Sequence, residues 1–279
     1  MDVKVCNLRS NEFNQDFVQS MLLTGFAVVT HHGIDHGLIR ETQAAWKEFF
    51  NNTRNYKDKF VNEKDPNMGF VGFGGEKAVG AQHRDLKEFF HWKPGQVIPE
   101  EVSSLTRKLY SLLEGDVAGQ LLYALNGNNA VSDLDFAKVC RNSDNTVLRA
   151  LYYPSSEEIG EEYSGAVRSA AHEDINFITL LVAASAPGLQ VKDNHDNWYD
   201  VPFEDNSITV NVGDMLQLTT KKAFKSTTHR VVNSDNSCAD RLSIPLFVHP
   251  NSDTMLIPGF TAQQYLDQRL NTIYQKVKK

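Results

Sequence analysis

The sequence predicts a mainly β protein with flanking helices, built around a sandwich or barrel in its second half. Two observations carry this prediction. From about residue 145 to 250, short apolar segments follow one another at short intervals, separated by Gly, Pro, Asn and Asp. On both sides of that region, apolar residues recur at the three- and four-residue spacings of amphipathic helices. We expect one structural unit made of an N-terminal α/β region (1–144), a core (145–250) and a C-terminal helix packed on the core (251–279).

Composition and charge narrow the functional classes. The chain has 279 residues, of which 41% are hydrophobic and 23% charged, so it belongs with globular proteins rather than with collagen-like or low-complexity chains. A chain of this length buries about three quarters of its unfolded surface, so a metal ion is not needed for stability and would serve a function. The formal net charge of −7 excludes a general basic field for nucleic acid or an anionic membrane surface.

The cysteines and the apolar runs indicate a cytoplasmic protein. Cys6, Cys140 and Cys238 are odd in number and form no CxxC pair, which argues against a disulfide framework. The longest apolar run, at 177–184, falls short of the ~20 residues that span a bilayer. The N-terminal segment lacks the pattern of a signal peptide. We therefore expect no membrane and no nucleic-acid partner.

The N-terminal region is expected to combine helices with a strand. Helical spacing over 10–25 changes to an apolar run at 25–30, which predicts a helix followed by a strand. The segment HHGID at 31–35 predicts a turn. The helical pattern then returns over 36–60.

Five glycines between Asp65 and Gly80 predict a loop. The Gly69–Gly80 segment suits a lid that closes over an active site, because glycine hinges accompany the apolar Phe70 and Phe73. Arg84, just beyond the loop, is a candidate substrate contact. A basic cluster here is interpreted as a solvated face in preference to an anion site, and it contains His83, Arg84, Lys87 and His91.

The remaining elements follow from the same patterns. A short strand is predicted at 85–92 and a long helix at 99–126, which ends at Asn126-Gly127. The closing helix is expected to begin at Thr261, a candidate N-cap. The strands between the two helices are predicted in the segments VLRALYYP, FITLLVAA, LQVKD, WYDVP, ITVNVGDMLQLTT, THRVV and RLSIPLFVHP.

Three residues of the β-rich half suggest a metal site. In an extended chain, residues i and i+2 project to the same face, so His172 and Asp174 can aim an imidazole nitrogen and a carboxylate oxygen at one point. His229 follows after enough chain for several strands. Two histidines and one carboxylate leave one face of an ion open, which is the arrangement of non-haem Fe(II) oxygenases. An isolated HxD is weak evidence, because most such histidines are solvated or packed in a core.

Arg241 and Ser243 form a second constellation. They are also spaced i, i+2, and they follow His229 at about the length of a hairpin. A guanidinium binds a carboxylate with two parallel hydrogen bonds and keeps its charge in a barrel interior, so the pair suits a carboxylate clamp. A structural salt bridge is the alternative for Arg241.

These residues lie within a longer resemblance. ITVNVGDMLQLTTKKAFKSTTHRVVN followed by DRLSIPLFVHP resembles the C-terminal half of the 2-oxoglutarate- and Fe(II)-dependent dioxygenase superfamily, in its isopenicillin N synthase-like branch. GFAVVTHHGI resembles that branch's GFF-V-NHGI segment, and DLKEFF resembles its D-KE-F segment. The similarity runs along nearly the whole chain in the family's order. It implies a double-stranded β-helix, or jelly roll, for the core at 145–250.

The resemblance also implies roles for single residues. His172, Asp174 and His229 would bind Fe(II), and Arg241 with Ser243 would hold the distal carboxylate of 2-oxoglutarate.

Next to this clamp, the sequence both keeps and departs from the family pattern. Tyr153, in RALYYP, falls where the family's N-x-Y-P tyrosine helps to hold the cosubstrate, whereas Leu151 occupies the family's Asn position. Some members of the branch keep the Arg-x-Ser pair without using 2-oxoglutarate. The pair therefore indicates a carboxylate without saying which one.

The activity implied is an oxygenase that consumes O₂ and oxidatively decarboxylates 2-oxoglutarate to succinate and CO₂. The coupled reaction would be hydroxylation, desaturation or cyclisation of a small molecule, with ascorbate as the reductant in vitro. Three alternatives remain open: an O₂-dependent oxidase of the same fold without 2-oxoglutarate, suggested by Leu151; a non-catalytic binding or sensor protein; and a zinc hydrolase, for which no motif supplies a general base. Substrate identity and oligomeric state stay open.

Overall fold

Two mainly antiparallel β-sheets and a layer of helices make up most of the fold. In the computed structural model of the chain, the described residues are 1–73, 87–126, 132–155, 169–182, 185, 187–232 and 240–277. Among the helices in these ranges, none has both the length and the hydropathy that crossing a membrane would require.

The larger sheet has eight strands, and all its neighbouring pairs are antiparallel except β1 with β2. In spatial order they are β1 (Val5–Asn7), β2 (Phe26–Thr30), β10 (Ile208–Val212), β7 (Ile178–Val182), β12 (Arg241–Val248), β5 (Val147–Tyr153), β4 (Glu88–Trp92) and β3 (Gly69–Val71). The smaller sheet contains β6 (Ser169–His172), β11 (His229–Val231), β8 (Leu189–Lys192) and β9 (Trp198–Asp200). Phe26 and Val28 of β2 pack against Val191 of β8, which joins the two sheets. The expectation of a jelly-roll core with flanking helices is confirmed.

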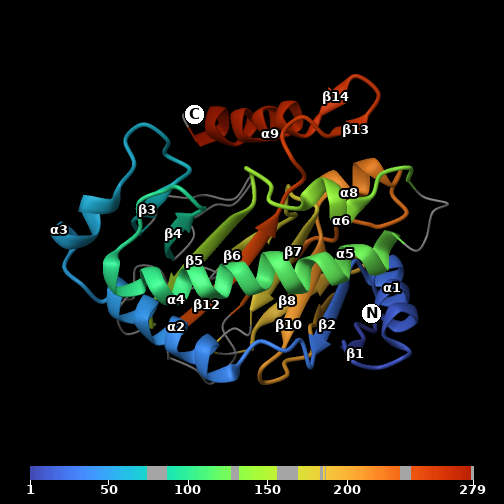
Figure 1. The fold of residues 1–279 in the computed structure, drawn as a ribbon, viewed down its shortest axis with the longest axis horizontal. Helices are drawn as coiled ribbons and strands as arrows, with labels where there is room; N and C mark the ends of the chain where they lie inside the picture. Colours follow the sequence, from blue (N-terminus) through green and yellow to red (C-terminus); the bar gives the residue numbers. More distant parts are fainter. Residues whose placement is uncertain are drawn as a thin grey trace.

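Helices cover one face of the larger sheet. They are α1 (Phe13–Thr24), α2 (His36–Phe50) and a long helix formed by α4 (Glu100–Ser111), the π-helical turn η2 (Leu112–Ala118) and α5 (Gly119–Asn126). Figure 1 shows this long helix, in green, crossing the strands, with α2 beside it. Leu148, Ala150 and Tyr152 of β5 enter the core under the helices, so the intervening residues of β5 point to the opposite face of the sheet. That opposite face carries the candidate site.

The predicted helix at 36–60 is divided in the structure. Helix α2 begins at the N-cap Asp35, whose side chain accepts a hydrogen bond from the Leu38 backbone N–H (2.9 Å). It ends at Phe50, and the chain continues in two short turns, α3 (Arg54–Lys57) and η1 (Asp58–Phe60). The break falls at Asn51-Asn52-Thr53, residues whose polar side chains compete for backbone hydrogen bonds and so disfavour a helix interior.

The lid prediction is wrong for Phe70. This residue lies in strand β3, where its ring is 2% exposed and packs against Phe49 in the core beneath the helices. Strand pairing with β4 overrides the turn preference of the glycines, because it buries that ring. Phe73 is 37% exposed, while Arg84 and the rest of the Gly69–Gly80 segment from residue 74 lie outside the described residues.

Phe70→Ala is therefore expected to lower the free energy of unfolding by about 3–5 kcal/mol, since it leaves a cavity in the core. Urea denaturation of the two proteins measures this change. Phe73→Ala is the matched control, and its exposed ring should contribute much less. Equal small changes in both variants would contradict the core position of Phe70.

A second correction concerns the segment 208–220 (ITVNVGDMLQLTT), which is among the predicted strand segments but is a strand only in its first part. Strand β10 ends at Val212, and residues Asp214–Thr219 form helix α8. Gly213 approaches the carbonyl oxygen of Asn176 so closely that a Cβ would lie 2.1 Å from it, and the helix starts at this contact. The neighbouring Asp214 N–H donates to the Asp174 carbonyl oxygen (2.7 Å), which ties α8 to the loop after β6.

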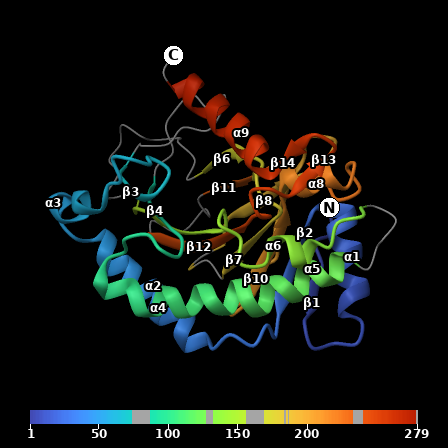
Figure 2. The ribbon, with the colours of Figure 1, turned by 45° about the horizontal axis from the view of Figure 1, so that its top comes forward.

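The C-terminal segment closes one end of the molecule. Helix α6 (Phe136–Cys140) and the hairpin of β13 (Met255–Ile257) and β14 (Phe260–Thr261) precede helix α9 (Ala262–Val277). Thr261 accepts a hydrogen bond from the Gln264 N–H (3.2 Å), as expected for the N-cap. Figure 2 shows α9, in red, near α8, and Arg269 of α9 forms an ion pair with Asp214 (2.9 Å).

Candidate metal centre

The structure brings the three predicted metal-binding residues together. Strand β6 pairs with β11, and their register places His172 opposite His229, with ring centroids 4.4 Å apart. Asp174 follows His172 by two residues, in the loop after β6. Residues far apart in the sequence therefore meet because two strands of the smaller sheet are hydrogen-bonded neighbours.

The ligand atoms point toward one position. Asp174 Oδ1 lies 3.8 Å from His172 Nε2 and 3.9 Å from His229 Nε2, and all three atoms lie within 4.8 Å of one another. These separations exceed a hydrogen bond. Metal-ligand bonds of roughly 2.0–2.2 Å place ligands around one ion at mutual distances of this order.

Both imidazoles are held in the tautomer that a metal requires. Nδ1 of His172 contacts the Ala170 carbonyl oxygen (2.8 Å), and Nδ1 of His229 contacts the Thr227 carbonyl oxygen (3.1 Å). A carbonyl oxygen only accepts, so each Nδ1 carries the proton and each Nε2 presents its lone pair to the site. The donor set thus fits a divalent ion such as Fe(II), with one face left for other ligands.

Asp174 is oriented by two side chains that the sequence analysis did not single out. Its Oδ2 accepts hydrogen bonds from Thr179 Oγ1 (2.5 Å) and from Asn211 Nδ2 (2.8 Å), so Oδ1 is the atom that faces the histidines. Thr179 and Asn211 are adjacent partners on β7 and β10. Each is a buried polar residue in a mainly apolar strand, and that sequence pattern was the available signal.

The charges of the centre are consistent with ion binding. Burial lowers the pKa of His172 to about 4, and the neighbouring His229 contributes to that lowering, so the ring is neutral near pH 7. For Asp174, burial raises the pKa, but electrostatic interaction with the two imidazoles and the two hydrogen bonds outweigh it and hold the pKa below its ordinary value. A neutral imidazole and an ionised carboxylate are the metal-binding forms of these groups.

Thr179→Val is expected to weaken iron binding roughly 10- to 100-fold, because Asp174 loses one of the two hydrogen bonds that orient it. Equilibrium dialysis of Fe(II) against the protein under anaerobic conditions measures this affinity. Thr106→Val is the control, since Thr106 is equally buried and accepts a hydrogen bond from Trp46 in the helical layer. Unchanged iron affinity in Thr179→Val would contradict the orienting role.

The predicted carboxylate clamp lies on the inner face of the larger sheet. Arg241 is 2% exposed, pairs with Tyr153 across β12 and β5, and places its guanidinium 5.8 Å from the centre of that ring. Ser243, also buried, pairs with Leu151. Leu151 packs against Phe89 and Tyr153, so an apolar contact occupies the position where the family has an amide. The three residues predicted to hold a cosubstrate thus lie together.

A cation beside this clamp was missed. Arg149, two residues before Leu151 on the same face of β5, lies over Phe89 and donates to His91 Nε2. The interpretation of the basic cluster as a solvated face is wrong for its two described members, because Lys87 is buried and His91 is half-buried against Arg149. Alternation along β4 turns His91 inward, and Lys87 lies directly before the strand; only strand pairing reveals this placement. His83 and Arg84 lie outside the described residues.

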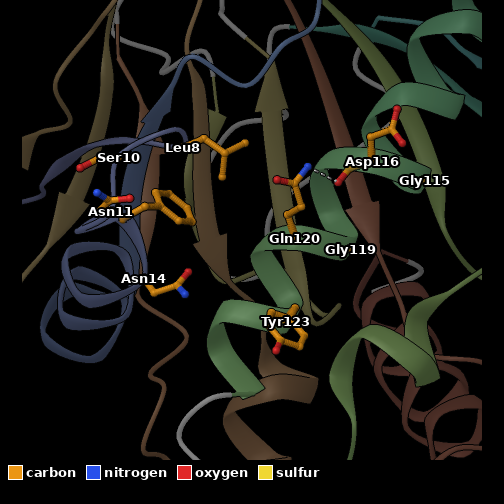
Figure 3. A pocket seen from close by; sticks show the side chains of 10 residues that line it. Leu8, Ser10, Asn11, Asn14, Gly115, Asp116, Gly119, Gln120 and Tyr123 are labelled. Carbon is orange, nitrogen blue, oxygen red and sulfur yellow. Dashed lines mark hydrogen bonds between the residues drawn. The ribbon is translucent and has the colours of Figure 1, made fainter.

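A hollow of about 680 Å³ lies elsewhere, between the segment after β1 and the η2–α5 helix. Figure 3 shows its lining, including Asn11, Gln120 and Tyr123. None of the candidate metal or clamp residues lines it, so it is separate from the metal centre.

Comparison with known proteins identifies the family. Residues 144–250 match the model of the 2OG-Fe(II) oxygenase superfamily, and residues 4–108 match that of the "non-haem dioxygenase in morphine synthesis N-terminal". Proline hydroxylase buaE of Petromyces alliaceus is 30% identical over 278 residues, which cover 88% of this chain and 83% of the relative. The chain belongs to the 2OG-Fe(II) oxygenase superfamily. It is an Fe(II)- and 2-oxoglutarate-dependent oxygenase, as the resemblance in its sequence implies.

Solved structures agree with the fold of this oxygenase. A Shewanella oneidensis protein assigned as an oxygenase superposes with a TM-score of 0.85 at 35% identity, over 98% of both chains. A full-length Neurospora crassa protein, solved in complex with alpha-KG, superposes with a TM-score of 0.80 at 23% identity, over 96% of this chain and 95% of the other. The second likeness shows the shared fold alone.

Proposed function

We propose that this oxygenase couples oxidative decarboxylation of 2-oxoglutarate to oxidation of a small-molecule substrate at the centre described above. In this proposal His172, Asp174 and His229 hold Fe(II). Arg241, Ser243 and Tyr153 bind 2-oxoglutarate. The observation that carries the proposal is the convergence of two Nε2 lone pairs and one carboxylate oxygen on a single position, with the buried Arg241 on the inner face of the adjoining sheet.

The protein's own contribution is to bind, orient and shield. Arg241 offers a guanidinium fork to the distal carboxylate of the cosubstrate, and Ser243 adds a hydroxyl on the same face of β12. The backbone carbonyls of Ala170 and Thr227 fix the imidazoles, and Thr179 with Asn211 fixes the carboxylate. With Fe(II) and 2-oxoglutarate bound, O₂ would be the oxidant: it would take two electrons from 2-oxoglutarate, which leaves as succinate and CO₂, and two from the substrate. The apolar side chains of Leu151 and Phe89 exclude water from the inner face of the larger sheet beside the clamp.

The alternatives from the sequence predict other outcomes. An oxidase without 2-oxoglutarate would consume O₂ without forming succinate, and a sensor protein would bind ligands without turnover. A zinc hydrolase would need a general base. Glu173 is the carboxylate next to the triad in the sequence. Its side chain accepts a hydrogen bond from the Thr228 hydroxyl, so it is already engaged with another residue.

The test is an anaerobic titration of the Fe(II) protein with 2-oxoglutarate, followed by exposure to O₂ with ascorbate as the reductant. We expect a visible charge-transfer band on titration and succinate after O₂ is admitted. Absence of both would reject the assignment of the cosubstrate to this centre. The same coupled assay then serves to screen substrates.

We also propose that the protein is cytoplasmic. Cys6 and Cys140, the cysteines within the described ranges, are buried free thiols, and burial raises the pKa of both. Protonated, buried thiols are inert, which suits a reducing compartment.

A further inference from the structure

The loop that carries Asp174 is held by the beginning of helix α8. The backbone N–H groups of residues 213–215 donate to the carbonyl oxygens of residues 174–177, with donor–acceptor distances of 2.7–3.2 Å. Met215 is fully buried, so these hydrogen bonds lie against an apolar interior, where they are stronger than in water. The position of the Asp174 backbone therefore depends on the position of the first turn of α8.

The first turn of α8 also carries Asp214, whose side chain contacts the C-terminal helix α9. Its Oδ2 lies 2.9 Å from Nη2 of Arg269, and the carboxylate is mostly buried whereas the arginine is partly exposed. Tyr265, one turn earlier on α9, lies beside the same carboxylate, and burial together with that charge raises the pKa of its hydroxyl to about 12. Gln263 anchors the start of α9 by accepting a hydrogen bond from Asn145 Nδ2 (3.1 Å). Arg269 thus reaches α8 from a helix whose first turn is fixed.

Arg269 compensates the charge of neighbouring carboxylates. Burial raises the pKa of Asp214, the charges of Glu173 and Asp174 add to that rise, and the charge of Arg269 counteracts it. Without the guanidinium, the repulsion among these carboxylates is relieved when Asp214 moves toward solvent. That movement displaces the first turn of α8 and, with it, the backbone of Asp174.

We propose that Arg269 is a positioning residue of the metal centre: its ion pair with Asp214 holds the first turn of α8, and through it the backbone of Asp174, where the triad binds Fe(II) most tightly. This proposal rests on the proposed function, which assigns Fe(II) to His172, Asp174 and His229. Helix α9 contributes none of these three ligands and acts on the metal centre through the backbone of the loop.

Iron binding and the docking of α9 are then coupled in both directions. If a docked α9 strengthens iron binding by some factor, bound iron strengthens the docking of α9 by the same factor. An ion pair that only stabilised the fold would hold α9 equally with and without the metal. This reciprocity distinguishes a positioning role from a structural one.

The first test replaces Arg269 by methionine, which keeps much of the side chain's length and removes its charge. Equilibrium dialysis of Fe(II) under anaerobic conditions should show a dissociation constant raised roughly 3- to 30-fold in Arg269→Met. Arg269→Lys, which keeps the charge, should recover part of the lost affinity. Arg107→Met is the matched control, because Arg107 lies on α4 in the helical layer and donates from Nε to Ser103 (3.0 Å). Its dissociation constant should match that of the wild type.

A double-mutant cycle tests whether Arg269 acts through Asp214. Asp214→Asn keeps the shape of the side chain and removes its charge. In that background, Arg269→Met should change the dissociation constant for Fe(II) by less than about 2-fold, because the carboxylate on which the arginine acts is gone. An undiminished effect of Arg269→Met in that background would overturn the proposed route.

The second measurement is hydrogen exchange of the α9 backbone amides in the anaerobic protein, with and without Fe(II). In the wild type, Fe(II) should slow the exchange of these amides about 3-fold or more, and in Arg269→Met the metal should have little effect. Arg107→Met should respond to the metal as the wild type does. Thermal melting of the metal-free proteins verifies that each variant is folded.

The outcomes separate this proposal from the one it rests on. If the wild type binds Fe(II) no better than His172→Ala, the assignment of iron to the triad fails and the proposed function fails with it. If the wild type binds Fe(II) through the triad, but Arg269→Met shows the same dissociation constant and the same exchange response, the positioning role is overturned and the proposed function stands.

Discussion

Asp174→Ala is expected to abolish Fe(II) binding and reduce iron-dependent turnover by roughly three orders of magnitude or more, with little loss of fold. The carboxylate is the only anionic group of the triad, and losing a ligand that contributes several kcal/mol corresponds to a rate change of that size. Stability should change modestly, because Thr179 and Asn211 lose an acceptor while the large core is untouched. Iron content, succinate formation and thermal melting are the three measurements.

Two further variants sharpen this result. His172→Ala should behave in the same way, since it removes one of the two Nε2 ligands. Asp196→Ala is the control: its carboxylate is 84% exposed and pairs with Lys192 at the surface, so iron content and turnover should match the wild type. Retained activity in Asp174→Ala or His172→Ala would refute the ligand assignment.

Arg241→Ala is expected to raise the apparent KM for 2-oxoglutarate roughly 10- to 100-fold, because it removes two parallel, charge-assisted hydrogen bonds to the cosubstrate carboxylate. Burial strengthens the effect, because a guanidinium that is 2% exposed binds a carboxylate in an interior of low dielectric constant. Steady-state succinate formation over a range of cosubstrate concentrations measures it.

A comparison with Arg241→Lys separates charge from shape. Lysine keeps the positive charge without the planar fork, so its KM should fall between those of the wild type and Arg241→Ala. Iron content should be the same in all three proteins, since Arg241 is not among the grouped metal ligands. An unchanged KM in Arg241→Ala would remove this residue from the cosubstrate site.

Much of the metal centre could be predicted from local sequence patterns. The HxD spacing places His172 and Asp174 on one face because side chains alternate along an extended chain, and Arg241 with Ser243 follows the same rule. The N-cap at Thr261 and the helical periodicity of 99–126 were equally readable, since each depends on residues within one or two turns. These features required no knowledge of what lies across the sheet.

Other features depended on partners distant in the sequence. Phe70 lies in a glycine-rich segment with a loop pattern, yet pairing with β4 makes it part of a strand and buries its ring. Asp214–Thr219 has an apolar pattern that suits a strand, yet the close approach of Gly213 to Asn176 starts a helix there. In both cases tertiary contacts outweighed a local preference worth ~1 kcal/mol or less per residue.

By itself, the sequence determined the kind of protein: a β core with flanking helices, a histidine-carboxylate pair with a second histidine, and a carboxylate clamp, in the order of an oxygenase family. Only the tertiary structure decided which groups surround them. Thr179 and Asn211 orient Asp174, and Arg149 stands beside Phe247, because neighbouring strands of a sheet bring together residues whose separation along the chain carries no signal. The fold class can be predicted from the hydrophobic periodicity within single segments. Which side chains meet on the inner face of the larger sheet depends instead on the register between its strands.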